Sequence, residues 1–351
     1  MEIIAHTDIE KWNVIVKSFP QWDVYYLCEY AISLMLHGDG VPILLYYDDG
    51  ELRITYVLMV SDIADFKPLS RLLKKNEYYD CETPYGYGGP LFDGRITERG
   101  LQNFCSELYE WAKSNNVVSQ FIRFHPVLKN YQTIEHEFNV INMKKTICMD
   151  TSSTALICNN MDRKNRNIIR KAKKSGISII HDKGENIDEF IKLYSETMDR
   201  NSADPYYYFG RKYYDYLINS MNNNLEVFYA VYDSSIIAGS IFFYNENQMH
   251  YHLSGSLSAY RNLGAMNYLL YEAAKWATKH HIQSLHLGGG VGIEDSLYNF
   301  KKQFNKISNT DFCIGGNIFL PDVADYLVSL RSNNDQSFNP SKPYFIKYRS
   351  P

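Results

Sequence analysis

Apolar positions along this chain follow the period of a helix in some segments and form short continuous runs in others. Between residues 101 and 112 they recur at three- and four-residue intervals, which predicts a helix with one apolar face. The runs 41–47 and 51–60 flank the turn Asp48-Asp49-Gly50, which predicts a β-hairpin. The other segments expected in the first half are helices 9–16 and 23–36 and a strand 117–124.

The second half repeats this plan. Runs 225–232 and 236–244 flank a polar turn as a second hairpin, and residues 266–277 carry the apolar face of another helix. Trp111-Ala112 corresponds to Trp276-Ala277, and both helices lead through a polar turn into a strand. Chance would explain these few identities, but the shared hairpin favours an internal duplication. The remaining expected segments are strands 145–151, 176–181, 249–254 and 284–287 and helices 162–174, 187–200, 210–221 and 296–304.

The order of these segments predicts two similar α/β domains. Strand, helix, strand, helices, three antiparallel strands, helix, strand, helix, strand is the order of the GNAT acetyltransferase fold. We therefore expect an α/β (α+β) protein of two tandem GNAT-like acyl-CoA N-acyltransferase domains, each a mixed, mostly antiparallel sheet flanked by helices. The expected domains are residues 1–150 and 151–351, and the tail after about residue 320 is expected to pack back on the first domain. A chain of 351 residues with 45% hydrophobic content is large enough for two cores.

Composition indicates the cellular location and the classes of partner more than the reaction. The apolar runs are of strand length, far below the roughly 20 residues of a membrane-spanning helix, so no transmembrane segment is expected. Six cysteines form no C-x-x-C pair and no secretory leader is recognisable, which favours a cytoplasmic location. A formal charge of −4 argues against a general nucleic-acid coat, and no DNA partner is expected, although a local basic patch could contact a phosphate backbone.

Two glycine-rich segments are candidate ligand loops. In Thr83–Pro90, three glycines and the residues Tyr85 and Tyr87 stand between two prolines, which fits either a rigid packed turn or a binding loop. The second segment, Gly288-Gly289-Gly290, follows a strand and could leave room for a substrate at the sheet edge, where Lys301 would project. The alternative is that Leu297, Phe300 and Phe304 form a core face of a short helix and Lys301 is solvated.

Cationic residues cluster on the helix expected at 162–174. This charge run fits a solvated helix face, or a phosphate-facing surface for tRNA, a nucleotide or an anionic carrier. The cations are Arg163, Lys164, Arg166, Arg170, Lys171, Lys173 and Lys174.

Further candidates lie at the ends of other elements. Arg200 ends a helix and precedes an aromatic stretch containing Tyr206 and Tyr208, an arrangement that serves the helix dipole or holds a diphosphate. His250 and His252 point to one face of a strand, where a metal would need a third ligand that the sequence does not offer.

A phosphate-binding turn is also expected from the sequence. The stretch from Arg261 through Gly264 partly matches the R/Q-x-x-G-x-G/A turn that holds the pyrophosphate of coenzyme A at a helix N-terminus. Met266 stands where that turn has a small residue, which would crowd an approaching phosphate.

Taken together, several segments resemble the Fem family of peptidoglycan-bridge aminoacyltransferases across nearly the whole chain. These segments are T-P-Y-G-Y-G-G-P, R-K-N-R-N-I-I-R-K-A-K-K, T-M-D-R, Y-H-L-S-G-S, H-L-G-G-G and F-K-K-Q-F. The resemblance implies transfer of an amino acid from aminoacyl-tRNA to an amine of a cell-wall precursor, without a metal. It also implies that Lys301 lies near the reacting centre and that Arg200 holds a diphosphate. His252 and Ser254 stand where the family often has tyrosines, and the coiled-coil insertion of some members is absent.

On this basis we expect direct attack of an amine on an activated ester or thioester, without a covalent enzyme intermediate and with no bound cofactor. Lys301 would act as electrostatic stabiliser, and the base would be a substrate phosphate, His252 or a carboxylate not yet identified. The alternatives are N-acylation of a sugar or small-molecule amine from acyl-CoA or an acyl carrier, and a non-catalytic binding protein. The expected site comprises catalytic Lys301 and His252, substrate-binding Arg200, Tyr85, Tyr87, Tyr206, Tyr208, Ser254, Gly288, Gly289 and Phe300, and cofactor-binding Arg261 and Gly264.

Overall fold

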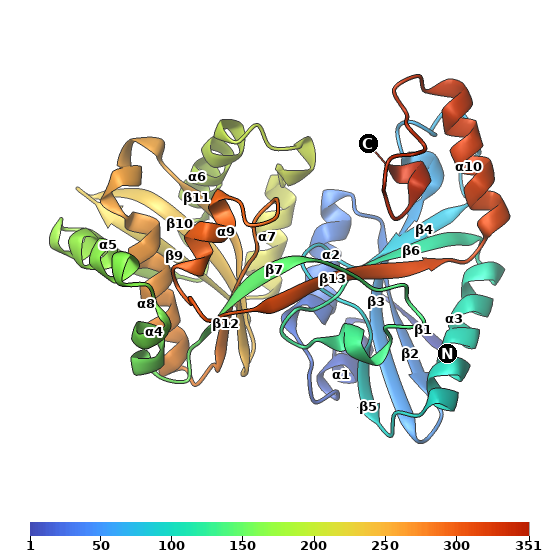
Figure 1. Ribbon diagram of the computed structural model, residues 1–351, viewed down its shortest axis with the longest axis horizontal. Coiled ribbons are helices and arrows are strands. Elements are labelled where there is room, and N and C mark those ends of the chain that lie inside the picture. The colour runs from blue at the N-terminus through green and yellow to red at the C-terminus, as the bar shows by residue number, and fades with distance from the viewer. Residues whose placement is uncertain (351) are drawn as a thin grey trace. The chain divides into compact units, whose positions relative to one another are not determined.

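The computed structural model describes residues 1–350. The chain folds into two compact units (Figure 1). The first unit contains Met1–Met143 together with the chain from Phe312 onward, and the second contains Lys144–Asp311. The expected second domain, 151–351, therefore extends too far. The reason is strand β13 (Thr310–Ile318), which pairs antiparallel with β6 (Val117–Arg123) and returns the chain to the first unit.

The first unit is a mixed sheet with helices α1 (Ile9–Lys17), α2 (Cys28–His37), α3 (Glu98–Ser114) and α10 (Pro321–Asn334). Its strand order is β1-β2-β3-β4-β6-β13, and β5 pairs off β3. All pairs are antiparallel except β4 with β6. The strands not yet placed are β1 (Glu2–Ala5), β2 (Val41–Asp48), β3 (Leu52–Asp62), β4 (Tyr79–Glu82) and β5 (Leu91–Gly94).

One expected helix of this unit is interrupted. Residues 23–36 were expected as one helix, but the chain forms a 3₁₀ turn at Val24–Tyr26 and begins α2 only at Cys28. Between them Leu27 has extended φ and ψ angles of −69° and 142°, which breaks the helical hydrogen-bond series.

The second unit has the strand order β7-β12-β11-β10-β9-β8. Here too one pair, β11 with β12, is parallel, and the others are antiparallel. Read from the opposite end, this is the same succession as in the first unit, as an internal duplication predicts. The strands are β7 (Ile141–Asp150), β8 (Ser178–Asp182), β9 (Leu225–Tyr232), β10 (Ser235–Tyr244), β11 (Gln248–Ser256) and β12 (Ser284–Gly288).

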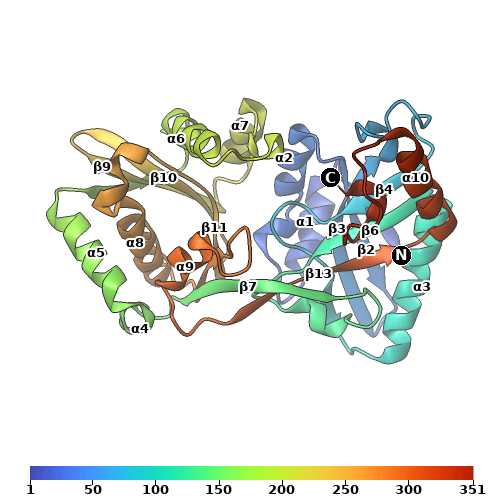
Figure 2. The same ribbon diagram turned by 45° about the horizontal axis from the view of Figure 1, so that its top comes forward.

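Helices cover both faces of this second sheet, which confirms the expected fold class (Figure 2). On one face, apolar residues of α8 and α5 pack with Phe242, Met249 and Leu285 in one buried cluster. On the other face α6 lies so close that a Cβ on Gly255 would come within 2.4 Å of the Leu193 backbone. The helices are α4 (Thr154–Asn160), α5 (Arg163–Lys174), α6 (Ile187–Arg200), α7 (Arg211–Ser220), α8 (Ala265–Lys279) and α9 (Ser296–Lys302). Within residues 1–350, no helix has the length and apolarity needed to cross a membrane.

Candidate functional site

Strand β12 ends in a glycine turn whose shape depends on the absence of side chains. Gly288 has a φ of 72°, in the left-handed region that favours glycine. A Cβ on Gly289 would lie 2.9 Å from the backbone oxygen of Lys145, and one on Gly290 would lie 1.9 Å from the Asp295 carboxylate. That carboxylate accepts hydrogen bonds of 2.8 Å from the amides of Gly292 and Tyr298, so it closes the turn and caps α9.

Lys301 is buried against this turn. Its side chain is 7% exposed, so the interpretation that it is solvated is wrong, and Leu297, expected in the core face of the helix, is 39% exposed. The Lys301 ammonium donates a hydrogen bond of 2.7 Å to the oxygen of Gly289 and lies 5.6 Å from the ring centre of Tyr251. Burial, and then the nearby Lys144 cation, lower the pKa of Lys301 to about 7.

Lys144 binds the next two carbonyl groups of the same turn. Its ammonium, half-buried on β7, donates to Gly290 at 2.6 Å and to Val291 at 3.0 Å. Burial lowers the pKa of Lys144 as well, while Asp295 opposes that effect. In the described part of the chain neither Lys144 nor Lys301 forms an ion pair with a carboxylate. Two lysine side chains therefore meet at this turn without an ion-pair partner, and the carboxylate that favours their charged forms is Asp295.

The floor beside Lys301 is aromatic and polar. Tyr251 packs on the same face of the sheet as Phe242 and donates a hydrogen bond of 2.6 Å to the hydroxyl of Ser254. Burial raises the pKa of Tyr251 to about 12, so its hydroxyl stays protonated at neutral pH. Tyr251 therefore links Ser254, an expected substrate-binding residue, to Lys301. Phe300, the residue before Lys301 on α9, is half-buried with its ring 5.5 Å from that of Phe304.

His252 lies on the other face of β11. A register shift opposite Ile241 and Phe242 places His252 next to Phe243, at a ring distance of 4.3 Å. Its Nε2 is 2.8 Å from the Tyr213 hydroxyl of α7. Burial lowers the pKa of His252 to about 3, so it is neutral at physiological pH and a weak base. The structure thus separates the two expected catalytic side chains.

Arg200 connects the end of α6 to the end of β11. Its guanidinium donates to the Ser256 oxygen at 3.0 Å and to the Thr197 hydroxyl at 3.3 Å, and it lies 3.7 Å from Glu196. Tyr206 and Tyr208 are 37% and 38% exposed in the segment that follows. The Tyr208 hydroxyl donates to the Asp199 carboxylate at 2.8 Å, and the contacts of Arg200 give it a structural use.

In the first unit, the segment Thr83–Pro90 is held by buried side chains. The Tyr30 hydroxyl donates to the Tyr85 oxygen at 2.5 Å, and the Tyr87 ring packs edge-on against Tyr25 at 5.7 Å. Gly86 has a φ of 98° and no room for a Cβ beside Tyr25. These contacts favour the rigid-turn interpretation of this loop.

The expected phosphate turn also has a packing explanation. Arg261 lies in the 3₁₀ helix Ser258–Leu263, and Gly264 follows with a φ of 71°. A Cβ on Gly264 would lie 2.5 Å from Ile168, so glycine is needed here for the close approach of α5 to the start of α8. Met266 packs partly into the same core cluster.

Helix α5 presents its cations to solvent. Ile169 and Ala172 are buried, and Arg166 is half-buried with hydrogen bonds to the oxygens of Cys158 and Met161. The other six cations form no ion pair with any residue that the structure describes, and all are exposed: Arg163, Lys164, Arg170, Lys171, Lys173 and Lys174.

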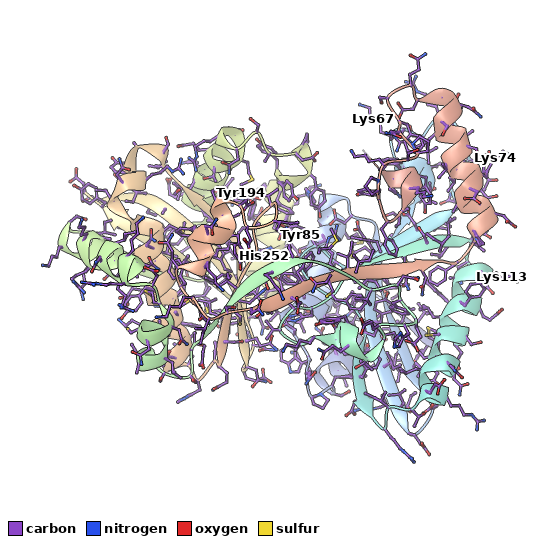
Figure 3. The ribbon with its side chains drawn as sticks, viewed as in Figure 1. Lys67, Lys74, Tyr85, Lys113, Tyr194 and His252 are labelled. Atoms are coloured by element: carbon purple, nitrogen blue, oxygen red, sulfur yellow. The ribbon has the colours of Figure 1, made fainter. Side chains whose placement is uncertain are left out.

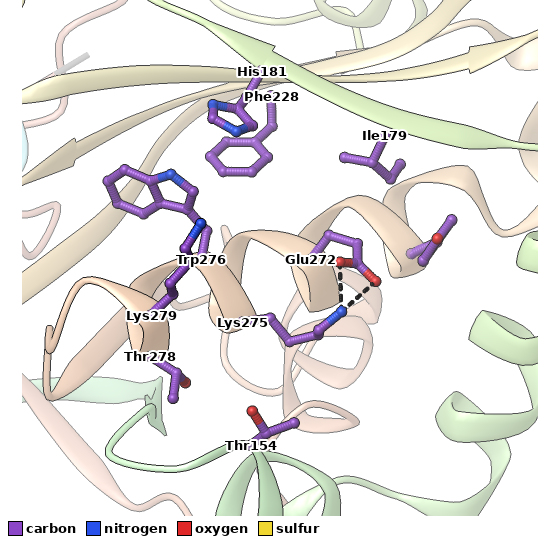
Figure 4. Close-up of a pocket in the computed structure, with 10 residues that line it drawn as sticks. Thr154, Ile179, His181, Phe228, Glu272, Lys275, Trp276, Thr278 and Lys279 are labelled. Atoms are coloured by element: carbon purple, nitrogen blue, oxygen red, sulfur yellow. Dashed lines mark hydrogen bonds and ion pairs between the residues drawn. The ribbon is translucent and has the colours of Figure 1, made fainter.

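A cleft of about 500 Å³ lies between α8, β8, β9 and the start of α4 (Figure 4). Trp276, Phe228 and His181 form one wall, and the ion pair of Glu272 with Lys275 lies opposite. Sequence patterns gave no reason to select this cleft, because its lining residues come from four separate elements. Lys144 and Tyr251 were missed as well, since neither stands in a spacing that distinguishes it from an ordinary strand residue.

Comparison with known families finds a similarity within the second unit. Residues 159–302 match the model of the acetyltransferase (GNAT) domain. No curated protein sequence matches the chain.

Solved structures resemble the chain over most of its length. A structure of FemX is similar with a TM-score of 0.66 and 16% identity, covering 93% of this chain and 99% of that one. The C-terminal domain of a protein described as a lysylphosphatidylglycerol synthetase, from Agrobacterium fabrum, has a TM-score of 0.54 at 12% identity and covers 92% and 96%. A tandem GNAT protein from the clavulanic acid biosynthesis pathway has a TM-score of 0.51 at 7% identity and covers 91% and 98%.

Proposed function

We propose that this protein, an acyltransferase whose second unit is a GNAT domain, moves an amino acid from aminoacyl-tRNA to an amine of a cell-envelope precursor, as Fem-type enzymes do. One observation carries the proposal: Lys301 is buried without a carboxylate partner at the glycine turn that ends β12. The fold likeness to FemX over 93% of the chain supports the same conclusion.

The transfer needs two reactants held in line and stabilisation of the oxyanion that develops on the ester carbonyl. An ammonium group in a partly dry site supplies that stabilisation more effectively than one in water. Lys301 lies in such a site, 5.6 Å from the ring centre of Tyr251. We assign Lys301 to the reacting centre and leave His252 out of it, because its neutral ring faces Tyr213 on the other side of β11.

The donor is proposed to bind along α5. Its six exposed cations fit a phosphate backbone, and affinity that depends on neutralising phosphates falls steeply as salt is added. Replacing Lys171, Lys173 and Lys174 by Gln should weaken the binding of charged tRNA. The same change should flatten the salt dependence by about one logarithmic slope unit for each phosphate that is no longer neutralised.

The matched control changes three exposed lysines of the first unit, Lys67, Lys74 and Lys113, to Gln (Figure 3). It removes the same charge from the protein but leaves α5 intact. Equal loss of tRNA affinity in both triple variants would show that net charge, rather than α5, attracts the RNA.

Arg200, with the exposed rings of Tyr206 and Tyr208, is proposed to hold the acceptor's diphosphate. Calorimetry with a UDP-linked muramyl pentapeptide and, in parallel, with acetyl-CoA tests this assignment. We expect binding of the muramyl peptide, lost in Arg200→Gln and kept in Arg211→Gln, a change in an exposed arginine of α7. Binding of acetyl-CoA alone would replace the proposal by N-acylation from a coenzyme A donor.

A further inference from the structure

Two consecutive lysines of β7 have different surroundings. The ammonium of Lys145 is 2.6 Å from the carboxylate of Asp311, so its charge is neutralised within the unit. The ammonium of Lys144 binds two backbone oxygens of the glycine turn and has no carboxylate partner among residues 1–350. Lys144 thus directs its ammonium group at carbonyl oxygens of the turn to which Lys301 also binds.

The two cations share one short turn. Lys301 binds the oxygen of Gly289, and Lys144 binds those of Gly290 and Val291, so three successive carbonyl groups point at two ammonium groups. Each contact holds the turn in place. The nearness of Lys144 also makes a positive charge on Lys301 less favourable, in the same direction as burial does.

The other groups that face Lys301 do not cancel this effect. From β11 comes the ring of Tyr251, with Ser254 on its hydroxyl. From the start of α9 comes Asp295, which favours the charged form of Lys301 but is occupied by two backbone amides. Burial and Lys144 together outweigh it.

We propose that Lys144 is a positioning residue of the Lys301 centre, which fixes the glycine turn and keeps the Lys301 amine able to accept a proton during acyl transfer. This inference rests on the proposed function for its chemistry, while its structural part stands on the three carbonyl contacts. It also supplies the base that the sequence left open.

With Lys301 as the base, every bond and proton of the transfer is accounted for within the site. The amine of the acceptor attacks the ester carbonyl carbon of the donor, a C–N bond forms, and the nitrogen becomes positively charged. Its proton passes to the neutral form of Lys301, and the ammonium group so formed stabilises the oxyanion. The C–O ester bond then breaks, and Lys301 returns the proton to the leaving oxygen, so that the enzyme ends in its starting state.

The test measures the titration of Lys301 directly, without substrates. Protein carrying ¹³C at the lysine ε position gives one signal per lysine, and the Lys301 signal is the one absent from Lys301→Met. We expect its midpoint near pH 7 in the wild type and about one unit higher in Lys144→Gln, because a neighbouring cation has been removed. Lys145→Gln is the matched control and should leave the midpoint unchanged, and Lys144→Arg should restore it.

An unchanged midpoint in a folded Lys144→Gln protein would overturn the inference. If Lys144→Gln does not fold, Lys144→Met and the arginine variant give the same comparison, with thermal unfolding as the check.

The pH dependence of transfer separates this inference from the proposed function. With Lys301 as proton acceptor, kcat/KM rises as the pH increases through 7. In Lys144→Gln this rise moves to higher pH by the same amount as the Lys301 titration midpoint. A rate that falls through this range would remove the base role. A shifted titration in a protein that transfers no amino acid would keep the lysine pair and reject the proposed function.

Discussion

The two glycine-rich turns of this protein are built with similar residues and held by opposite kinds of donors. In Thr83–Pro90 the backbone oxygens accept hydrogen bonds from neutral groups. The Tyr26 hydroxyl binds Gly89 at 2.9 Å, and the Asn130 amide binds Gly88 at 2.9 Å and Pro90 at 3.1 Å. In the turn that ends β12, the corresponding oxygens are bound by the ammonium groups of Lys144 and Lys301.

The hydrogen-bond donors distinguish the roles of the two turns better than their glycine content does. Neutral buried donors satisfy the carbonyl groups without bringing an ammonium charge to them, which suits a turn that only fixes the chain. At the β12 turn, ammonium groups without carboxylate partners bind the carbonyl oxygens. Their positive charge is then available to a substrate. Two glycine-rich turns can therefore look alike in the sequence and differ in role. The hydrogen-bond donors that bind their backbone oxygens distinguish a structural turn from one that belongs to a reacting centre.

The largest effect is expected at Lys301. Its pKa is about 7 in the folded protein against an ordinary value of 10.5, so between these values the unfolded chain binds more protons. Its contribution to stability is therefore complete above pH 10.5 and is lost as the pH falls to about 7. Lys301→Met should remove a pH-dependent part of the free energy of unfolding of roughly 5 kcal/mol.

Urea unfolding of both proteins across this pH range measures the difference. Lys302→Met, a change in the neighbouring lysine whose ammonium binds the Ser308 oxygen, should follow the wild type. Parallel curves for wild type and Lys301→Met would show that Lys301 titrates normally, and the contrast between the two turns would fail.

A smaller effect is expected in the neutral turn. Asn130 is buried, and its amide donates to the oxygens of Gly88, Pro90 and Tyr26. Asn130→Ala leaves these oxygens without that donor and should lower the free energy of unfolding by about 2 kcal/mol. The Lys301 titration should not move. A shifted Lys301 midpoint in this variant would mean that the two turns are not independent.

The smallest effect is expected at Gly290. A methyl group there would displace the Asp295 carboxylate and break its hydrogen bonds at the start of α9, which should cost about 1 kcal/mol. Gly292→Ala is the matched control, since its Cβ would have no neighbour nearer than 3.9 Å. Thermal unfolding of the two variants should therefore separate them. Equal melting temperatures would show that Asp295 does not hold the turn.

Much of the fold follows from local patterns, because long periodic segments such as α3 and α8 and the two hairpins determine their own structure. The four-residue strands β1, β4 and β5 were not predicted, since so short a segment acquires strand geometry only from its partners. The return of the chain through β13 was placed too late, because pairing with β6 depends on residues about 190 positions away.

For the site, the sequence pointed to Lys301 but not to its burial. The role of Lys144 was hidden because Lys144 and Lys145 are chemically alike, and only the pairing of β7 with β12 places the glycine turn beside them. His252 was assigned to the reacting centre because the sequence does not reveal which face of β11 meets α9. Whether His252, Tyr85, Tyr87, Arg261 and Gly264 contact a ligand stays a prediction.

The most direct test of the central claim is a single-turnover transfer reaction with labelled aminoacyl-tRNA and a muramyl pentapeptide. We expect label on the peptide amine with the wild type and with Lys302→Met, and at least about a hundredfold slower transfer with Lys301→Met. Thermal unfolding would confirm that all three proteins are folded. Transfer at the wild-type rate by Lys301→Met would contradict the assignment of the β12 turn as the reacting centre.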